Sequence, residues 1–223
     1  MERDAAARTP RPVRFPLADL DEQLQAFLLR WPSARADKKG LQFVGAAAAR
    51  LRVPLLAPRV AAGERLCDYA PRAALVPAVH LVLLLQAGAM ALGCWDGEQL
   101  VAHKASRRYV VRGNGKAQML HQKTRGKSRY GSRLRLQNWK RLLVETNERL
   151  HELESAHGPF DRVFLGAPVR LWTELFTATP SPPFGRDDDR LQRVPMHVHR
   201  PDFQELLRVH RWLGHGRLEL PAD

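Results

Sequence analysis

A block of basic residues with no acidic residue inside it is the part of this sequence best suited to chemistry. Between Glu98 and Glu145 there is no aspartate or glutamate, and 13 basic residues equal the net charge of +13, so the rest of the chain is balanced. A solvated surface normally mixes both signs, so we favour nucleic acid as the partner over a membrane surface or a solubilising loop. The 13 residues are Lys104, Arg107, Arg108, Arg112, Lys116, Lys123, Arg125, Lys127, Arg129, Arg133, Arg135, Lys140 and Arg141.

The middle of this block combines glycines, bases and one amide side chain. Gly113 and Gly115 precede Gln118, and glycine lets a backbone approach a nucleotide closely. A glutamine amide both donates and accepts hydrogen bonds. Too few apolar residues fall in this stretch to form a core, so we expect a mobile loop over residues 113–132. Most single loop glutamines are only solvated, so the role of Gln118 depends on the surrounding pattern.

Other groups of reactive residues are weaker candidates. His197 and His199 share one face of an expected strand, but no third ligand is evident, so a polar strand face is favoured over a metal site. Residues 187–189 are aspartates without the alternating ligands of a calcium loop and predict a solvated turn. Cys67 and Cys94 lack a partner pair and are expected to be small buried hydrophobes. We therefore expect no metal and no cofactor.

Hydrophobic periodicity predicts the elements that must position the basic block. Residues 80–95 and 98–111 should form a long antiparallel hairpin around the turn at residues 96–97. Apolar residues at steps of three and four from Leu136 to Leu153 predict a long helix. A strand over 161–166, a helix over 168–176, a strand over 193–199 and a helix over 201–213 follow. The expected fold class is α/β, with a mixed sheet and helices packed on its faces.

The chain organisation predicts one principal domain and a small N-terminal part. Residues 1–16 read as a flexible basic arm, and residues 17–74 as a helical segment with helices over 17–31 and 44–51 and mostly loop over 52–75. Residues 75–217 form the principal domain. The longest apolar run, over residues 79–90, is shorter than the roughly 20 residues of a membrane-spanning helix, and no secretory signal is evident. We expect a cytoplasmic monomer without a membrane partner.

The sequence from His103 to Arg112, HKASRRYVVR, is followed after five residues by Gln118 and later by GSRLR at residues 131–135. Together these motifs resemble the Vms/ANKZF-type release-factor-like (VLRF) family, over about residues 75–215. The resemblance implies a domain similar to the GGQ-bearing middle domain of eukaryotic and archaeal class I release factors. Such domains enter the peptidyl-transferase centre of the large ribosomal subunit and cleave nascent chains from tRNA.

The resemblance also assigns roles to individual residues. Gln118 matches the functional glutamine of the family as the catalytic residue, and Gly113 and Gly115 match its loop glycines. Ala117 stands where the release-factor motif has glycine, a form that occurs among Vms-type relatives. The implied RNA-binding residues are Arg107, Arg108, Arg112, Lys116, Lys123, Arg125, Lys127, Arg129, Arg133 and Arg135.

The function predicted on this basis is codon-independent release of nascent chains from stalled ribosomes by a ribosome-associated peptidyl-tRNA hydrolase. Its partners would be the large ribosomal subunit and peptidyl-tRNA. Two alternatives stay open. The first is an endonuclease that cuts tRNA near the CCA end, and the second is a non-catalytic factor that binds ribosomes or tRNA through the same basic residues.

Overall fold

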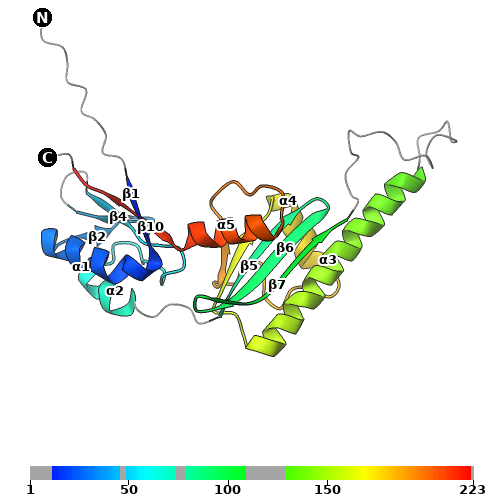
Figure 1. Ribbon diagram of the computed structural model, residues 1–223, viewed down its shortest axis with the longest axis horizontal. Helices are drawn as coiled ribbons and strands as arrows, with labels where there is room; N and C mark the ends of the chain where they lie inside the picture. The colour runs from blue at the N-terminus through cyan, green and yellow to red at the C-terminus, as the bar shows by residue number, and fades with distance from the viewer. Residues whose placement is uncertain (1–11, 46–48, 74–78, 109–128, 222–223) are drawn as a thin grey trace, which may run out of the picture. The chain divides into compact units, whose positions relative to one another are not determined.

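The computed structural model describes residues 12–45, 49–73, 79–108 and 129–221, with the backbone alone at residues 129–132 (Figure 1). The chain divides into two compact units. The first comprises Met1–Pro77 and His210–Asp223, and the second comprises Ala78–Val209. Within the described ranges, no helix has the length and apolar character needed to cross a membrane.

The second unit is built on a five-stranded mixed sheet with the strand order β7-β6-β5-β8-β9. The three strands β5, β6 and β7 form an antiparallel meander, whereas β8 runs parallel to both β5 and β9. This arrangement confirms the predicted α/β class with its mixed sheet and antiparallel hairpin. The strands are β5 Val79–Gln86, β6 Ala89–Asp96, β7 Gln99–Arg107, β8 Arg162–Gly166 and β9 Leu191–Arg193.

Two of the predicted strand boundaries are wrong. The single strand expected over residues 80–95 is divided at Gly88, whose φ of 83° suits a tight turn that glycine adopts without a steric cost. The strand expected over 193–199 covers only its first residue, because β9 ends at Arg193. Val194 still donates to the carbonyl of Leu165 over 3.0 Å, but Pro195 has no N–H and cannot continue the ladder.

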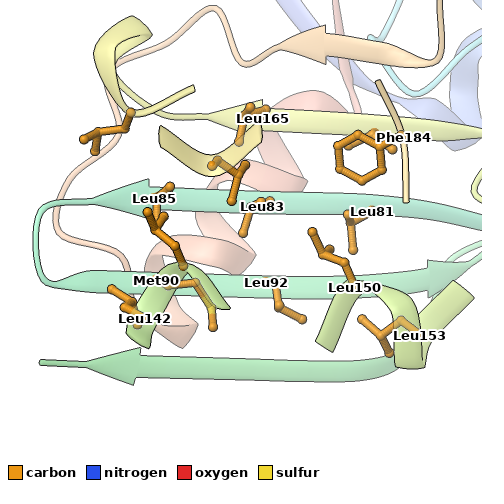
Figure 2. Close-up of a cluster of buried hydrophobic side chains, with 14 of the residues drawn as sticks. Leu81, Leu83, Leu85, Met90, Leu92, Leu142, Leu150, Leu153, Leu165 and Phe184 are labelled. Carbon is orange, nitrogen blue, oxygen red and sulfur yellow. The ribbon is translucent and has the colours of Figure 1, made fainter. Parts of the chain in front are cut away.

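One face of this sheet packs against two helices, α3 Arg129–His157 and α4 Val169–Thr177. Side chains alternate along a strand, and one set from β5 and β6 enters a core with α3, as Figure 2 shows. The leucine side chains of this core are fully or almost fully buried. The core includes Leu81, Leu83, Leu85, Met90, Leu92, Leu142, Leu150, Leu153, Leu165, Leu171, Leu175 and Phe184.

The opposite face lies against helix α5 Phe203–Leu213. A methyl group at Gly93 of β6 would lie 2.6 Å from the ring of Trp95 and 3.0 Å from Leu206 of α5. The absence of a side chain at Gly93 therefore lets α5 approach the sheet closely. Leu206 and Val209 are fully buried as a result.

Helix α3 is longer than its apolar pattern predicts. It begins at Arg129 rather than near Leu136, so the last residues of the loop expected over 113–132 are helical. Arg133, Leu134 and Arg135 are good helix formers and extend the helix beyond its apolar stripe. Residues 113–128 of the expected loop lie outside the described part of the chain.

The first unit contains an antiparallel sheet with the strand order β1-β10-β4-β3-β2. Its core includes Phe15, Phe27, Phe43, Leu51 and Tyr69. The elements are β1 Val13–Pro16, η1 Leu17–Asp19, α1 Leu20–Arg30, β2 Arg35–Ala36, β3 Phe43–Val44, β4 Arg50–Arg52, α2 Leu66–Ala73 and β10 His215–Glu219.

The N-terminal part thus contains more strand than the sequence predicts. The helix expected over residues 44–51 is wrong at its described ends, because Phe43 pairs with Leu51 in register and both are fully buried. At these two positions strand pairing and burial outweigh helix propensity. The loop expected over 52–75 contains α2, whose Leu66, Tyr69 and Ala73 form its buried face. The helix expected near residues 17–31 is confirmed as α1.

Candidate nucleic-acid interface

The end of β7 leads directly into residues 109–128, the central segment of the basic block. Arg107 is the last residue of the strand, and the N–H of Arg108 donates to the carbonyl of Gly88 over 2.9 Å. Gly88 belongs to the turn between β5 and β6, so the backbone is anchored to the sheet up to Arg108. From there, the chain continues into residues 109–128 and returns at the start of α3.

Arg108 connects this strand end to α3. Its Nη2 donates to Oε1 of Glu145, and the two side chains are 26% and 30% exposed. This hydrogen bond lowers the pKa of Glu145 against the opposing effect of partial burial, and nearby Lys104 and Arg141 lower it further. The guanidinium of Arg108 is therefore engaged within the protein, and its pairing connects the end of β7 to α3.

Glu145 is a structural residue that the sequence interpretation did not assign. It appeared there only as the first acidic residue after the basic block. The two residues are 37 positions apart in the sequence, so no local pattern could identify Arg108 as the partner of Glu145.

Arg107 has a weaker attachment at the same end of the sheet. Its Nη2 lies 3.0 Å from Oδ2 of Asp202, with the side chains 51% and 41% exposed. Ion pairs this exposed contribute little to stability, so Arg107 can exchange Asp202 for a phosphate. Asp202 also accepts a hydrogen bond from the N–H of Glu205 at the start of α5, which caps that helix. Nearby, the ring of His103 packs on Phe203, with centroids 4.3 Å apart.

The N-terminal turns of α3 form the other basic surface. Figure 1 shows this part of α3 continuing past the end of β7. No side chain from residues 133–138 is buried, and Leu134 and Leu136 are 38% and 55% exposed. The first buried side chain is Trp139, whose Nε1 donates to Glu174 of α4. Arg133 is exposed on this segment and Arg135 is partly exposed, so both are positioned on a helix that projects from the core.

The structure describes the two flanks of the predicted site. Lys104 and Arg107 on β7 and Arg133 and Arg135 on α3 supply bases on both sides of residues 109–128. Such an arrangement can neutralise the phosphates of an RNA that contacts the intervening segment. Eight predicted residues lie outside the described part of the chain: Gly113, Gly115, Gln118, Arg112, Lys116, Lys123, Arg125 and Lys127. The side chain of Arg129 lies outside it as well.

The two candidate metal ligands, His197 and His199, belong to a hydrogen-bonded support next to α5. The N–H of His199 donates to Oε1 of Glu205 over 2.6 Å, and its Nδ1 lies 3.3 Å from Oε2. Arg208 donates to both carboxylate oxygens of Glu205 over 2.7 Å and to the carbonyl of His197 over 2.9 Å. Over the residues described, no group of three or more potential metal ligands comes together.

The Arg208 guanidinium and the His199 N–H hold the pKa of Glu205 at about 2, below its ordinary value of 4.5 and against the effect of burial. Replacing Glu205 with glutamine should cost about 2 kcal/mol of folding free energy at pH 7. A depressed pKa stabilises the fold above the ordinary value, and this contribution is lost as pH falls from about 4.5 toward 2. Urea unfolding followed by tryptophan fluorescence should therefore show the two proteins converging over that range.

The exposed pair between Glu152 and Arg149 on α3 provides the control. Glu152→Gln should match the wild type at every pH, because exposed pairs contribute little. A difference between wild type and Glu205→Gln that stays constant as the pH falls below 4.5 would contradict a stabilising charge on Glu205.

Comparison with known proteins identifies a family model and two curated relatives. The family model described as Bacteroidetes VLRF1 release factor matches residues 80–219. The tRNA endonuclease ANKZF1 of Mus musculus is 36% identical over 137 residues, which cover 60% of this chain and 18% of that protein. Its Homo sapiens counterpart is 35% identical over 137 residues, covering 58% and 18%. The match thus spans less than a fifth of these curated relatives.

Among solved structures, the Vms1 mitochondrial localization core is similar in fold. The TM-score is 0.50 with 14% sequence identity, over 93% of this chain and 82% of that one. At this identity the likeness concerns the fold, and it agrees with a release-factor-like α/β domain.

Proposed function

Because the chain belongs to the bVLRF1 family of release factors, we propose that it is a ribosome-associated peptidyl-tRNA hydrolase that frees nascent chains from stalled ribosomes without reading a codon. The observation that carries the proposal is the family match over residues 80–219, which includes the whole basic block and Gln118. The proposed partners are the large ribosomal subunit and peptidyl-tRNA, met in the cytoplasm by a monomer.

The proposed reaction requires few catalytic groups from the protein itself. Cleaving the ester between a peptide and a ribose oxygen needs a positioned water and stabilisation of charge on the carbonyl oxygen. Ribosomal RNA and tRNA supply much of this apparatus. Gln118 would contribute an uncharged amide that donates and accepts hydrogen bonds, while Gly113 and Gly115 would let the backbone approach the nucleotide. The pairing of Arg108 with Glu145 supports the proposal, since it orients both elements that lead into this segment.

One alternative has a specific observation in its favour. The curated relatives that match at 35–36% identity are named tRNA endonucleases. An endonuclease would cut a phosphodiester bond near the CCA end of the tRNA and so detach the peptide together with a few nucleotides. It would use the same basic surfaces to hold the acceptor stem, so only the products separate the two reactions.

The experiment that tests the proposal uses the purified protein and ribosomes that carry peptidyl-tRNA labelled in the peptide and at the 5′ end of the tRNA. One gel resolves free peptide, full-length tRNA and shortened tRNA. Release of free peptide with full-length tRNA is expected for the hydrolase. Shortened tRNA would establish the endonuclease instead, and binding to the ribosomes without any cleavage would leave a non-catalytic factor.

A further inference from the structure

The sheet of the first unit has one face that collects arginines from distant parts of the chain. Arg14 of β1 pairs directly with Arg217 of β10, which pairs directly with Arg52 of β4. Residues that pair directly across a sheet point to the same face, so these three arginines form a row. Arg50 and Arg35 lie on the same face, connected in register through Val44 of β3.

The register also shows that this face points away from the core. The neighbours of the row along each strand are Phe15, Leu51 and Leu218, and all three pack in the core of the unit. Side chains alternate along a strand, so the arginines project from the other side. Arg14 is exposed, and Arg52 and Arg217 are partly exposed.

Three arginines of this face, Arg14, Arg52 and Arg217, lack a charged partner among the described residues, whereas Arg35 interacts with Asp68. Glu219, opposite Arg50, is the one acidic residue that the register places among the five arginines in the described strands. Within the described part of the chain, Arg14, Arg52 and Arg217 form no ion pair. Like charges directly opposite each other on neighbouring strands are unfavourable, and an anion placed over the row would relieve this repulsion.

We propose that this arginine face, formed by Arg14, Arg35, Arg50, Arg52 and Arg217, binds the phosphate backbone of structured RNA, as a second RNA-binding surface separate from the basic block. Guanidinium groups bind phosphate in a bidentate manner. A sheet face cannot enter the deep, narrow major groove of A-form RNA, but it can lie across the phosphates and riboses of the shallow groove. The surface does not depend on cleavage and would serve a hydrolase or an endonuclease alike.

Over its described strands, the arginine face lacks large exposed apolar side chains, and this favours RNA over an anionic membrane as its partner. Amphipathic membrane-binding surfaces combine bases with apolar side chains that insert below the headgroups. The exposed large hydrophobic residues described in this unit are Val13, Leu29 and Leu41. Val13 pairs with Leu218 on the core side of the sheet, and the other two lie outside the sheet strands.

The test compares two triple variants of the full chain that lose the same charge. Arg14→Gln, Arg52→Gln and Arg217→Gln removes the row, whereas Lys38→Gln, Lys39→Gln and Arg59→Gln removes three exposed bases elsewhere in the unit. Affinity for a fluorescent double-stranded RNA is measured against salt concentration. Loss of the row should reduce the slope of log K against log salt by about one per phosphate contact, and the control triple should change it much less.

Equal losses in the two triples would overturn the proposal, as would loss of binding to phosphatidylserine vesicles with RNA affinity unchanged. A single charge-reversal variant keeps the proposal testable if the triple variant does not fold. Arg217→Glu places a carboxylate between Arg14 and Arg52, so its melting temperature should equal or exceed that of the wild type while RNA affinity falls at least about fivefold. Wild-type RNA affinity in the folded Arg217→Glu protein would also overturn it. Gln118→Ala should retain full RNA affinity, which separates this test from that of the proposed catalysis.

Discussion

Gln118→Ala should lower the rate of peptidyl-tRNA cleavage on ribosomes by about two to three orders of magnitude, the loss typical when one group that stabilises developing charge is removed. Binding to the ribosome should be unchanged, because the uncharged amide contributes nothing to phosphate neutralisation and the bases around it remain. Single-turnover cleavage at saturating protein, together with cosedimentation with ribosomes, measures the two properties separately.

Gln122→Ala is the matched control, since it removes the same side chain four positions further along the same basic segment. It should cleave at close to the wild-type rate. If Gln118→Ala retained the wild-type rate, the catalytic role proposed for this residue would be refuted whatever the products. Equal losses in Gln118→Ala and Gln122→Ala would point to a general disturbance of the segment rather than to one reactive amide.

Reversing the charge of Arg108 should produce the next largest loss of activity, about a hundredfold for Arg108→Glu. Its partner Glu145 lies 16 residues after the start of α3, a distance of about 24 Å along the helix axis. A small change in the crossing of β7 and α3 therefore displaces the entry to α3 by more than it displaces the pair itself. Misplacement of a reacting group by about 1 Å can cost about 10²-fold in rate.

The double variant Arg108→Glu with Glu145→Arg should recover most of the lost rate, because it restores the ion pair in reversed order. Single-turnover rate at saturating protein is the readout, and ribosome affinity and melting temperature should stay near those of the wild type. Glu152→Arg, which breaks the exposed pair with Arg149 further along α3, should leave the rate unchanged. Failure of the charge swap to restore activity in a folded protein that binds ribosomes would argue against a positioning role for the pair.

Local sequence patterns were sufficient for the elements around the site. The turn at residues 96–97 predicted the hairpin of β6 and β7, and the apolar spacing from Leu136 to Leu153 predicted the packed part of α3. Both signals depend on neighbours within a few residues, where the periodicity of a strand or a helix is fully expressed. The acid-free block was equally visible, because its charges are adjacent along the chain. The catalytic role of Gln118 came from resemblance to a family and remains a prediction.

The sequence by itself therefore determined the α/β class, the main helices of the second unit and the position of the basic block. Only the tertiary structure decided which charges lie together. Arg108 meets Glu145 over 37 positions, and Arg14, Arg52 and Arg217 become neighbours only when β10 pairs with β1 and β4. Outside the basic block the charges balance in number, so no local excess revealed this face. Strand register brings together residues that are far apart in the sequence, and no periodic pattern of the sequence predicts these pairs. The register of β1, β10 and β4 is determined by burial of Phe15, Leu51 and Leu218 on the other side of the sheet.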